Sequence, residues 1–114
     1  MSNQKGELVV DARTLGSTVV LSACGEVDVI TAPKLSAAIA EAVATNPAVL
    51  VIDLTGVGFI GSAGLSVLVA AWESGMNPRM KVVASRQVRR PMEVIGLDTV
   101  LDVYETVAQA LGSD

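Results

Sequence analysis

Hydrophobic residues near the start of the chain follow the two-residue period of β-strands. Residues 7–12 and 18–24 alternate between apolar and polar positions or run apolar, and both segments are rich in β-branched side chains. Between them stands Leu15-Gly16-Ser17, and glycine beside serine is typical of a tight turn. The pattern therefore predicts an N-terminal pair of strands.

A helical period follows these strands. Between residues 33 and 44, apolar side chains recur at i, i+4, i+7 and i+8 from Leu35, behind a proline that suits a first helical turn. Asn46-Pro47 ends this amphipathic helix. Residues 48–54 then form an uninterrupted apolar run, which is typical of a strand covered on both faces. We expect that strand at the centre of the sheet.

The second half of the chain repeats the alternation of helix and strand. A second helix is expected to begin at Ser62 and to end at Gly75. Its buried face is predicted to consist of Leu65, Leu68, Val69 and Trp72. Strands are expected over 80–84 and 100–104, and a closing helix over 106–111. The sequence therefore predicts an α/β fold with a mostly parallel sheet, right-handed crossovers and the first strand added at an edge.

A third helix between these last strands contains a proline. It should carry Val88, Met92 and Ile95 toward the sheet and end at Gly96. Pro91 complicates the helix, because proline beyond the first turn removes a backbone hydrogen bond and clashes with the preceding turn. Two alternatives follow: the helix is kinked there, or it begins only near Arg90.

Composition and charge narrow the class of protein. The 114 residues suit one domain, and with 51% hydrophobic but only 3% aromatic residues the core must be built from Val, Leu, Ile and Ala. The net charge of −4 repels nucleic acid and anionic membrane surfaces. No apolar run approaches the roughly 20 residues of a membrane span. Cys24 is the single cysteine and is expected to fill a small space in the core, in a reduced cytoplasmic setting.

The chain contains no histidine, which excludes Ser-His and Cys-His nucleophile pairs and most zinc sites.

Asp53 ends a predicted central strand, as the phosphoaccepting aspartate of response-regulator receivers does. The carboxylates that would hold Mg²⁺ there are missing, because the first strands contribute only Asp11 and Asp28 lies in another loop. We therefore interpret Asp53 as an acceptor for turn amides, and we predict neither an enzyme nor a bound cofactor.

Glycines at 56, 58 and 61 match the fingerprint of dinucleotide-binding folds. That fingerprint needs an acidic residue about 20 positions later, where this sequence has valines, and Phe59 would bring apolar bulk to the phosphate side. Nucleotide binding therefore stays a minor alternative. The segment GSAG over 61–64 lacks the first glycine of a hydrolase nucleophile elbow, because position 60 is isoleucine.

Ser62 has two interpretations. It is a helix N-cap, whose hydroxyl accepts a backbone hydrogen bond and contributes about 1 kcal/mol. Alternatively it is a phosphoacceptor, because an exposed hydroxyl at a helix N-terminus beside glycines is open to approach. The helix dipole would stabilise a phosphate there, so that modification would leave the fold intact.

Two segments resemble the signatures of STAS-domain anti-sigma factor antagonists. They are GEVDVITA over 25–32 and DLTGVGFIGSAGL over 53–65. The likeness covers nearly the whole chain, and it implies a single STAS domain over residues 1–114 with about four helices. STAS domains also occur in transporter tails and signalling complexes, so a scaffold subunit without phosphorylation is the alternative.

The resemblance implies a partner-switching mechanism. The unphosphorylated protein binds an anti-sigma factor related to histidine-kinase ATPase domains and thereby frees a sigma factor. That partner, or a related kinase, supplies ATP and Mg²⁺ and phosphorylates the serine that matches Ser62, and a PP2C-type phosphatase restores the active form. Contacts are expected from loops 25–31 and 57–64 and from the second helix. The partner-binding residues implied are Asp28, Thr31, Gly58, Gly61, Ser62, Ala63, Gly64 and Ser66.

Individual positions qualify the resemblance. Asp28 has a second interpretation as a turn-capping aspartate. Gly61 and Ala63 stand where many relatives carry an aspartate and a second hydroxyl, so the loop is wider and less charged. Ser66, one turn after Ser62, is the competing acceptor and is expected to be less exposed.

Overall fold

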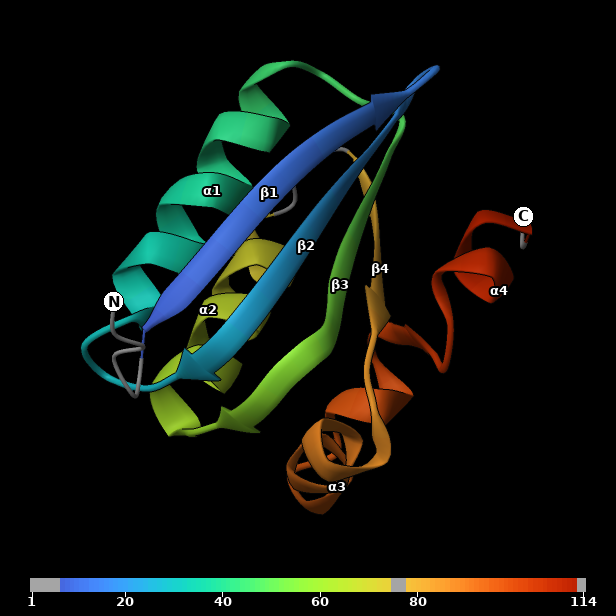
Figure 1. Cartoon of the computed structure of the whole chain (residues 1–114). Coiled ribbons are helices and arrows are strands. Elements are labelled where there is room, and N and C mark those ends of the chain that lie inside the picture. The colour runs from blue at the N-terminus through green and yellow to red at the C-terminus, as the bar shows by residue number, and fades with distance from the viewer. Residues whose placement is uncertain (1–6, 75–77, 113–114) are drawn as a thin grey trace.

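A mixed sheet forms the centre of the structure (Figure 1). The computed structural model describes residues 7–74 and 78–112. Within them the sheet has five strands in the order β1-β2-β3-β4-β5; β1 is antiparallel to β2, and the other neighbours are parallel. The strands are β1 (Leu8–Leu15), β2 (Thr18–Val27), β3 (Val49–Ile60), β4 (Arg79–Val83) and β5 (Asp102–Tyr104). The predicted α/β class, central strand and added N-terminal edge strand are confirmed.

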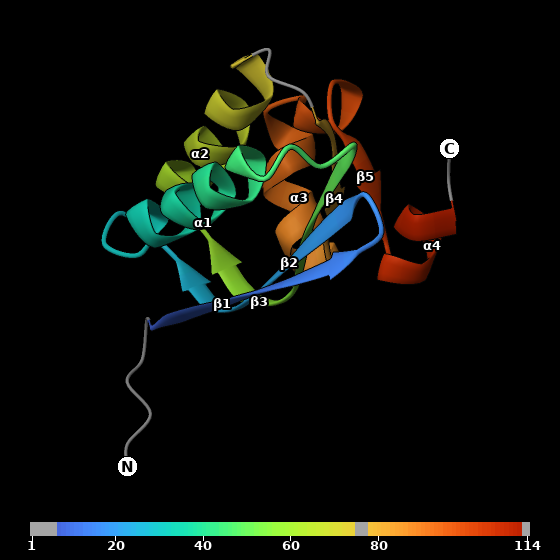
Figure 2. The ribbon, with the colours of Figure 1, turned by 90° about the horizontal axis from the view of Figure 1, so that it is seen from above.

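Three helices cover one face of the sheet and a short fourth helix lies against the other (Figure 2). The helical segments are α1 (Ala32–Ala44), α2 (Ser62–Glu73), α3 (Arg86–Val94), the 3-10 turn η1 (Leu97–Thr99) and α4 (Val107–Gly112). The larger core joins α1, α2 and α3 to alternate strand residues such as Leu21, Ile52 and Val82. The intervening residues Val20 and Val51 pack beneath α4.

A buried lysine attaches α4 to the sheet. Lys81, on β4, is 3% exposed, and its Nζ donates a 2.8 Å hydrogen bond to the carbonyl of Ala110. The ammonium group also lies 5.6 Å from the centre of the Tyr104 ring, within range of a cation–π interaction. A positive charge at the last turn of a helix is favoured by the helix dipole.

The strand β3 is longer than its apolar run predicted. It continues through Thr55 to Ile60, where it pairs with the end of β2 across two register shifts. The loop expected over residues 57–64 is therefore strand as far as Ile60 and helix from Ser62. The loop expected over residues 25–31 shortens to 28–31, because β2 extends to Val27.

Three side chains differ from their predicted places. Trp72 is 45% exposed and Ile95 is 56% exposed, so neither lies in the core, although Leu65, Leu68, Val88 and Met92 do. Cys24 is exposed rather than core-filling, because it lies on the sheet face that α4 only partly covers. Ser66, the competing acceptor, is exposed, as Ser62 is.

The helix α3 includes its proline. It begins at Arg86 and continues past Pro91, so the alternative in which it begins near Arg90 is wrong. It is followed by Gly96, whose φ of 81° is in the left-handed region that glycine adopts without strain. The end that was predicted for α2, Gly75, lies outside the described residues.

Candidate functional site

Two neighbouring strand ends bring the signature segments together. Gly61, which joins β3 to α2, donates its amide to the carbonyl of Val27 at the end of β2, at 2.8 Å. The loop after β2 and the start of α2 therefore lie at the same edge of the sheet, where parallel sheets usually carry their functional residues. We call residues 28–31, 58–62 and 66 the Ser62 surface.

Hydrogen bonds fix the shape of the loop over residues 28–31. Asp28 Oδ1 accepts the amides of Ile30 at 2.9 Å and Thr31 at 3.0 Å. Thr31 Oγ1 in turn accepts the amide of Asp28 at 2.9 Å and donates to the carbonyl of Glu26 at 2.7 Å. Asp28 thus caps the turn, as its second interpretation expected, and it holds the loop in one conformation.

The same hydrogen bonds also lower the pKa of the Asp28 carboxyl group. The backbone amide of Thr31, with a smaller contribution from Ile30, holds the pKa of Asp28 below its ordinary value. Because the folded state binds the proton more weakly than the unfolded state, the carboxylate stabilises the fold above its ordinary pKa. That stabilisation is lost as the pH falls through the depressed pKa.

The protein is therefore expected to lose more thermal stability on acidification than the Asp28→Asn variant does. Asparagine keeps the acceptor oxygen but does not titrate in this range. The measurement is the melting temperature of both proteins from about pH 5 to about pH 3, below the ordinary pKa of aspartate. Parallel curves for the two proteins would show that Asp28 contributes nothing to the pH dependence.

Ser62 is the first residue of α2 but not its cap. The N-cap residue is Gly61, with extended backbone, and no side chain caps the helix. The Ser62 side chain is exposed. Its hydroxyl is thus not used in capping, and it lies at the positive end of a 12-residue helix. This geometry removes the N-cap interpretation and leaves an accessible hydroxyl.

The glycines around Ser62 differ in their surroundings. A Cβ on Gly58 would meet no atom within 4 Å, whereas one on Gly61 would lie 3.3 Å from the ring of Phe59. Gly64 is buried, and a Cβ there would lie 2.5 Å from Val27 Cγ1 and 2.7 Å from Ile60 Cγ1. Gly64 therefore lets α2 pack closely on the sheet.

The other predicted partner-binding residues reach the surface to different degrees. Gly58, Ser62 and Ser66 are exposed, and Asp28, Thr31, Gly61 and Ala63 are half-buried. Gly64 presents no surface to a partner, so its influence on the site is through packing.

Sequence reasoning missed three apolar side chains on this surface. Val29 is 77% exposed, Ile30 is 82% exposed and Phe59 is 52% exposed. Large apolar groups exposed together are typical of a protein-binding surface. Periodicity could not identify them, because two lie in a loop and the third follows a glycine near a strand end.

The remaining motifs have structural roles. Gly56 and Gly58 lie within β3, so the glycine fingerprint does not form a phosphate-binding turn. Asp53 Oδ1 accepts the amide of Thr55 at 3.0 Å and its hydroxyl at 2.7 Å, so it accepts a backbone amide as expected, but within β3 and not in a turn. Over residues 7–74 and 78–112, no cluster of three potential metal ligands occurs and no helix is long and apolar enough to span a membrane.

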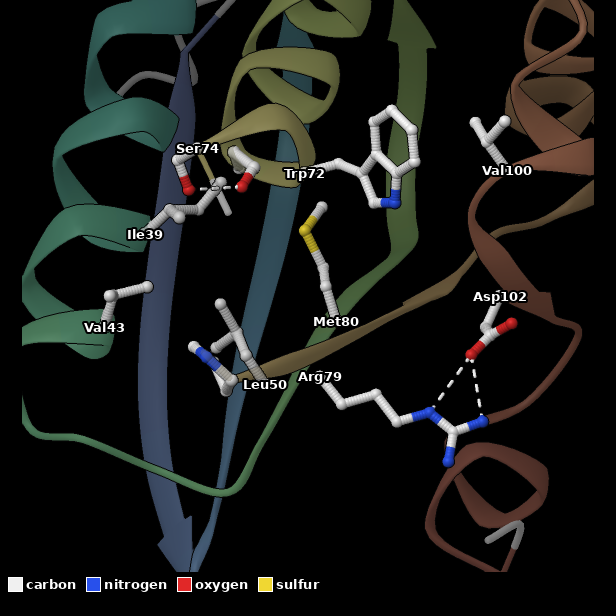
Figure 3. A pocket seen from close by; sticks show the side chains of 11 residues that line it. Ile39, Val43, Leu50, Trp72, Ser74, Arg79, Met80, Val100 and Asp102 are labelled. Carbon is white, nitrogen blue, oxygen red and sulfur yellow. Dashed lines mark hydrogen bonds and ion pairs between the residues drawn. The ribbon is translucent and has the colours of Figure 1, made fainter. Parts of the chain in front are cut away.

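A separate hollow of about 280 Å³ lies at the amino ends of the parallel strands (Figure 3). Trp72, Leu50 and Met80 line it, and Arg79 donates from Nε and Nη2 to Asp102 Oδ2 at 3.3 and 3.2 Å beside it. This end of the sheet is opposite to the Ser62 surface, so the hollow is not part of the candidate site.

Known proteins share both this sequence and this fold. The STAS domain family model matches residues 9–110. Anti-sigma-F factor antagonist RsfB of Mycobacterium tuberculosis (strain ATCC 25618 / H37Rv) is 48% identical over 94 residues, which are 81% of this chain and 77% of the relative. A crystal structure of an anti-sigma factor antagonist from Mycobacterium paratuberculosis has a TM-score of 0.89 at 36% identity, covering 96% of each chain.

A more distant structure shows the same fold. The anti-sigma factor antagonist SpoIIAA in its unphosphorylated form has a TM-score of 0.73 at 18% identity, covering 90% of this chain and 93% of its own. The Bacillus protein SpoIIAA is also known in a phosphorylated form, with a TM-score of 0.67 at 18% identity and coverage of 90% and 96%. These matches confirm the resemblance that the two signature segments indicated. The chain therefore belongs to the STAS domain family, and over most of its length it is similar to anti-sigma factor antagonists.

Proposed function

We propose that this protein is an anti-sigma factor antagonist switched by phosphorylation of Ser62. In its unphosphorylated form it binds an anti-sigma factor of the histidine-kinase-ATPase-like type and so releases a sigma factor. The observation that carries the proposal is the exposed Ser62 hydroxyl at the uncapped N-terminus of α2. Its place in a chain 48% identical to an anti-sigma-F factor antagonist supports the choice of partner.

The chemistry of the switch needs little from this chain. Ser62 Oγ attacks the γ-phosphorus of ATP held by the partner, the bond to the β,γ-bridging oxygen breaks, and ADP leaves. The hydroxyl proton passes to a base of the partner or to water. A PP2C-type phosphatase would hydrolyse the serine phosphate and restore the binding form. This chain contributes an accessible oxygen and the positive helix end that accepts the new charge.

The two states then differ mainly in charge. A phosphate adds about −1.5 to −2 charges at pH 7. At the start of α2 the helix dipole stabilises an anion by about 0.3–1 kcal/mol, so the fold tolerates it. Within an interface, an uncompensated charge costs about 3–5 kcal/mol, which corresponds to at least a 100-fold loss of affinity. Binding therefore fails without a change of shape.

The exposed apolar side chains of Val29, Ile30 and Phe59, which lie on the Ser62 surface, would contribute to the free energy of partner binding. Ile30→Ala and Phe59→Ala are each expected to weaken binding of the anti-sigma factor by about 10- to 100-fold, because buried apolar anchors contribute about 1–3 kcal/mol. Isothermal titration calorimetry measures the change. Leu15→Ala is the matched control, since Leu15 is 46% exposed at the end of β1, beside the start of β2 and far from the Ser62 surface. Equal losses in all three variants would contradict this use of the surface.

Protein recovered from cells of the source organism tests the function. We expect an intact mass about 80 Da heavier in a fraction of the molecules, from one phosphoryl group located on Ser62. We also expect co-purification of an anti-sigma factor with the wild type but not with Ser62→Glu. Unmodified Ser62 under every growth condition, with the same partners for both proteins, would favour the scaffold alternative instead.

A further inference from the structure

Positive charge gathers on α3 although the chain as a whole is acidic. The net charge is −4, yet Arg86, Arg89 and Arg90 supply three of the eight lysines and arginines within five residues. Together with Ala84, Glu93 and Glu105 they line a hollow of about 410 Å³, which we call the arginine hollow. One wall is α3, and the other is formed by residues that follow β4 and β5.

The three arginines occupy electrostatically unfavourable positions in their helix. Arg86 and Arg89 lie in the first turn of α3, where the helix dipole is positive and acidic residues are favoured, and Arg90 follows directly. No acidic residue stands in the first turn, and the N-cap residue, Ser85, forms no side-chain capping hydrogen bond. Arg86 and Arg90 are four residues apart, so like charges share one face of the helix. An anion in the arginine hollow would relieve each of these repulsions.

Interactions within the protein leave much of this positive charge uncompensated. Arg89 Nε lies 3.3 Å from Glu93 Oε2 in an ion pair, but without the geometry of a hydrogen bond. Among the described residues, Arg86 and Arg90 form no ion pair. Ser85 Oγ, at the start of α3, is buried and has no hydrogen-bond partner among the described residues. The arginine hollow therefore has two guanidinium groups available to an external anion.

The carboxylates in the arginine hollow indicate which anion fits. Glu93 and Glu105 lie on its lining and would repel a compact, multiply charged group such as phosphate. A polypeptide carries its negative charges on separate side chains, which can reach Arg86 and Arg90 while the backbone passes the two glutamates. Charge complementarity thus favours an acidic polypeptide over a small anion.

A hydrogen bond connects this region to the Ser62 surface. Gln87 Nε2, on α3, donates to the carbonyl of Gly58 at 2.9 Å. We propose that the arginine hollow docks an acidic segment, a run of aspartate or glutamate, of the protein that covers the Ser62 surface. Only the identity of that protein rests on the proposed function; the affinity of the hollow for acidic polypeptide does not.

Nuclear magnetic resonance of the ¹⁵N-labelled full chain with a hexaglutamate peptide tests the inference. We expect saturable shifts of the amides of residues 85–90 that weaken with added salt. The double variant Arg86→Gln/Arg90→Gln should bind the peptide about tenfold more weakly, since an exposed ion pair contributes up to about a factor of five. Arg13→Gln, which removes a positive charge from the distant edge strand β1, should bind as the wild type does.

Three outcomes would overturn the inference. They are no shifts on α3, an equal loss of binding in Arg13→Gln, or tighter binding of inorganic phosphate than of hexaglutamate at the same amides. Because this titration uses neither Ser62 nor an anti-sigma factor, its failure leaves the proposed function standing. Conversely, equal affinity of the anti-sigma factor for the wild type and Ser62→Glu would contradict the proposed function, even if hexaglutamate still bound in the arginine hollow.

Discussion

Ser62→Glu is expected to bind the anti-sigma factor about 100-fold more weakly than the wild type, whereas Ser62→Ala keeps wild-type affinity and accepts no phosphate. Glutamate places a permanent charge where the partner surface must close over an exposed hydroxyl at the start of α2. An uncompensated charge in an interface costs about 3–5 kcal/mol. Because a carboxylate is smaller than a phosphate and carries less charge, we expect its cost to lie at the lower end of that range. Calorimetric titration of the three proteins measures the difference.

A matched substitution separates charge at this position from charge in general. Ser17→Glu adds the same charge in the exposed turn between β1 and β2, at the opposite end of the sheet and outside the Ser62 surface. Ser17→Glu should bind as the wild type does, and a loss equal to that of Ser62→Glu would show that the added charge acts through the net charge of the protein. Indistinguishable affinities of Ser62→Glu and Ser62→Ala would contradict a charge-based switch at Ser62.

Gly25→Ala is expected to destabilise the protein by about 3 kcal/mol. Gly25 has a φ of 125°, and a Cβ there would collide with the backbone carbonyl of Glu7. The unfavourable backbone conformation costs about 1–3 kcal/mol, and relief of the collision requires a shift of β1 that costs a further 1–3 kcal/mol, about as much as overpacking. Urea unfolding followed by circular dichroism gives the change in free energy.

Gly58→Ala is the control for this substitution. Gly58 also lies near the end of a strand at the Ser62 surface, but a Cβ there meets nothing within 4 Å and its φ is not positive. Its free energy of unfolding should stay within about 0.5 kcal/mol of that of the wild type, as for most surface changes. Equal stabilities for the two alanine variants would show that the β1–β2 edge does not need glycine at position 25.

Periodicity located the helices and strands because most have one apolar face of ordinary length, and the central strand has an uninterrupted apolar run that is buried on both faces. It failed at the end of β3, where two glycines and a threonine interrupt the apolar pattern that marks a strand. Pairing with β2 maintains the strand there, through register shifts that no single segment reveals. Cys24 was misplaced for a related reason, since its exposure depends on how far α4 reaches across the sheet.

The candidate site was predictable where its signal is local. A hydroxyl beside glycines between an apolar strand and an amphipathic helix identified Ser62, and the structure places it at the helix start. The exposure of Ile30 and Phe59 was not predictable, because it depends on which elements end near them. The sequence also could not show which residue is the N-cap of α2, since both Gly61 and Ser62 are suitable N-cap residues.

Protein phosphorylated uniformly on Ser62 tests the central claim most directly. We predict that its affinity for the anti-sigma factor is at least about 100-fold lower than that of unmodified protein. Amide chemical shifts away from the Ser62 surface should be the same in both forms, because the positive end of α2 accepts the phosphate. Equal affinities of the two forms would contradict the claim.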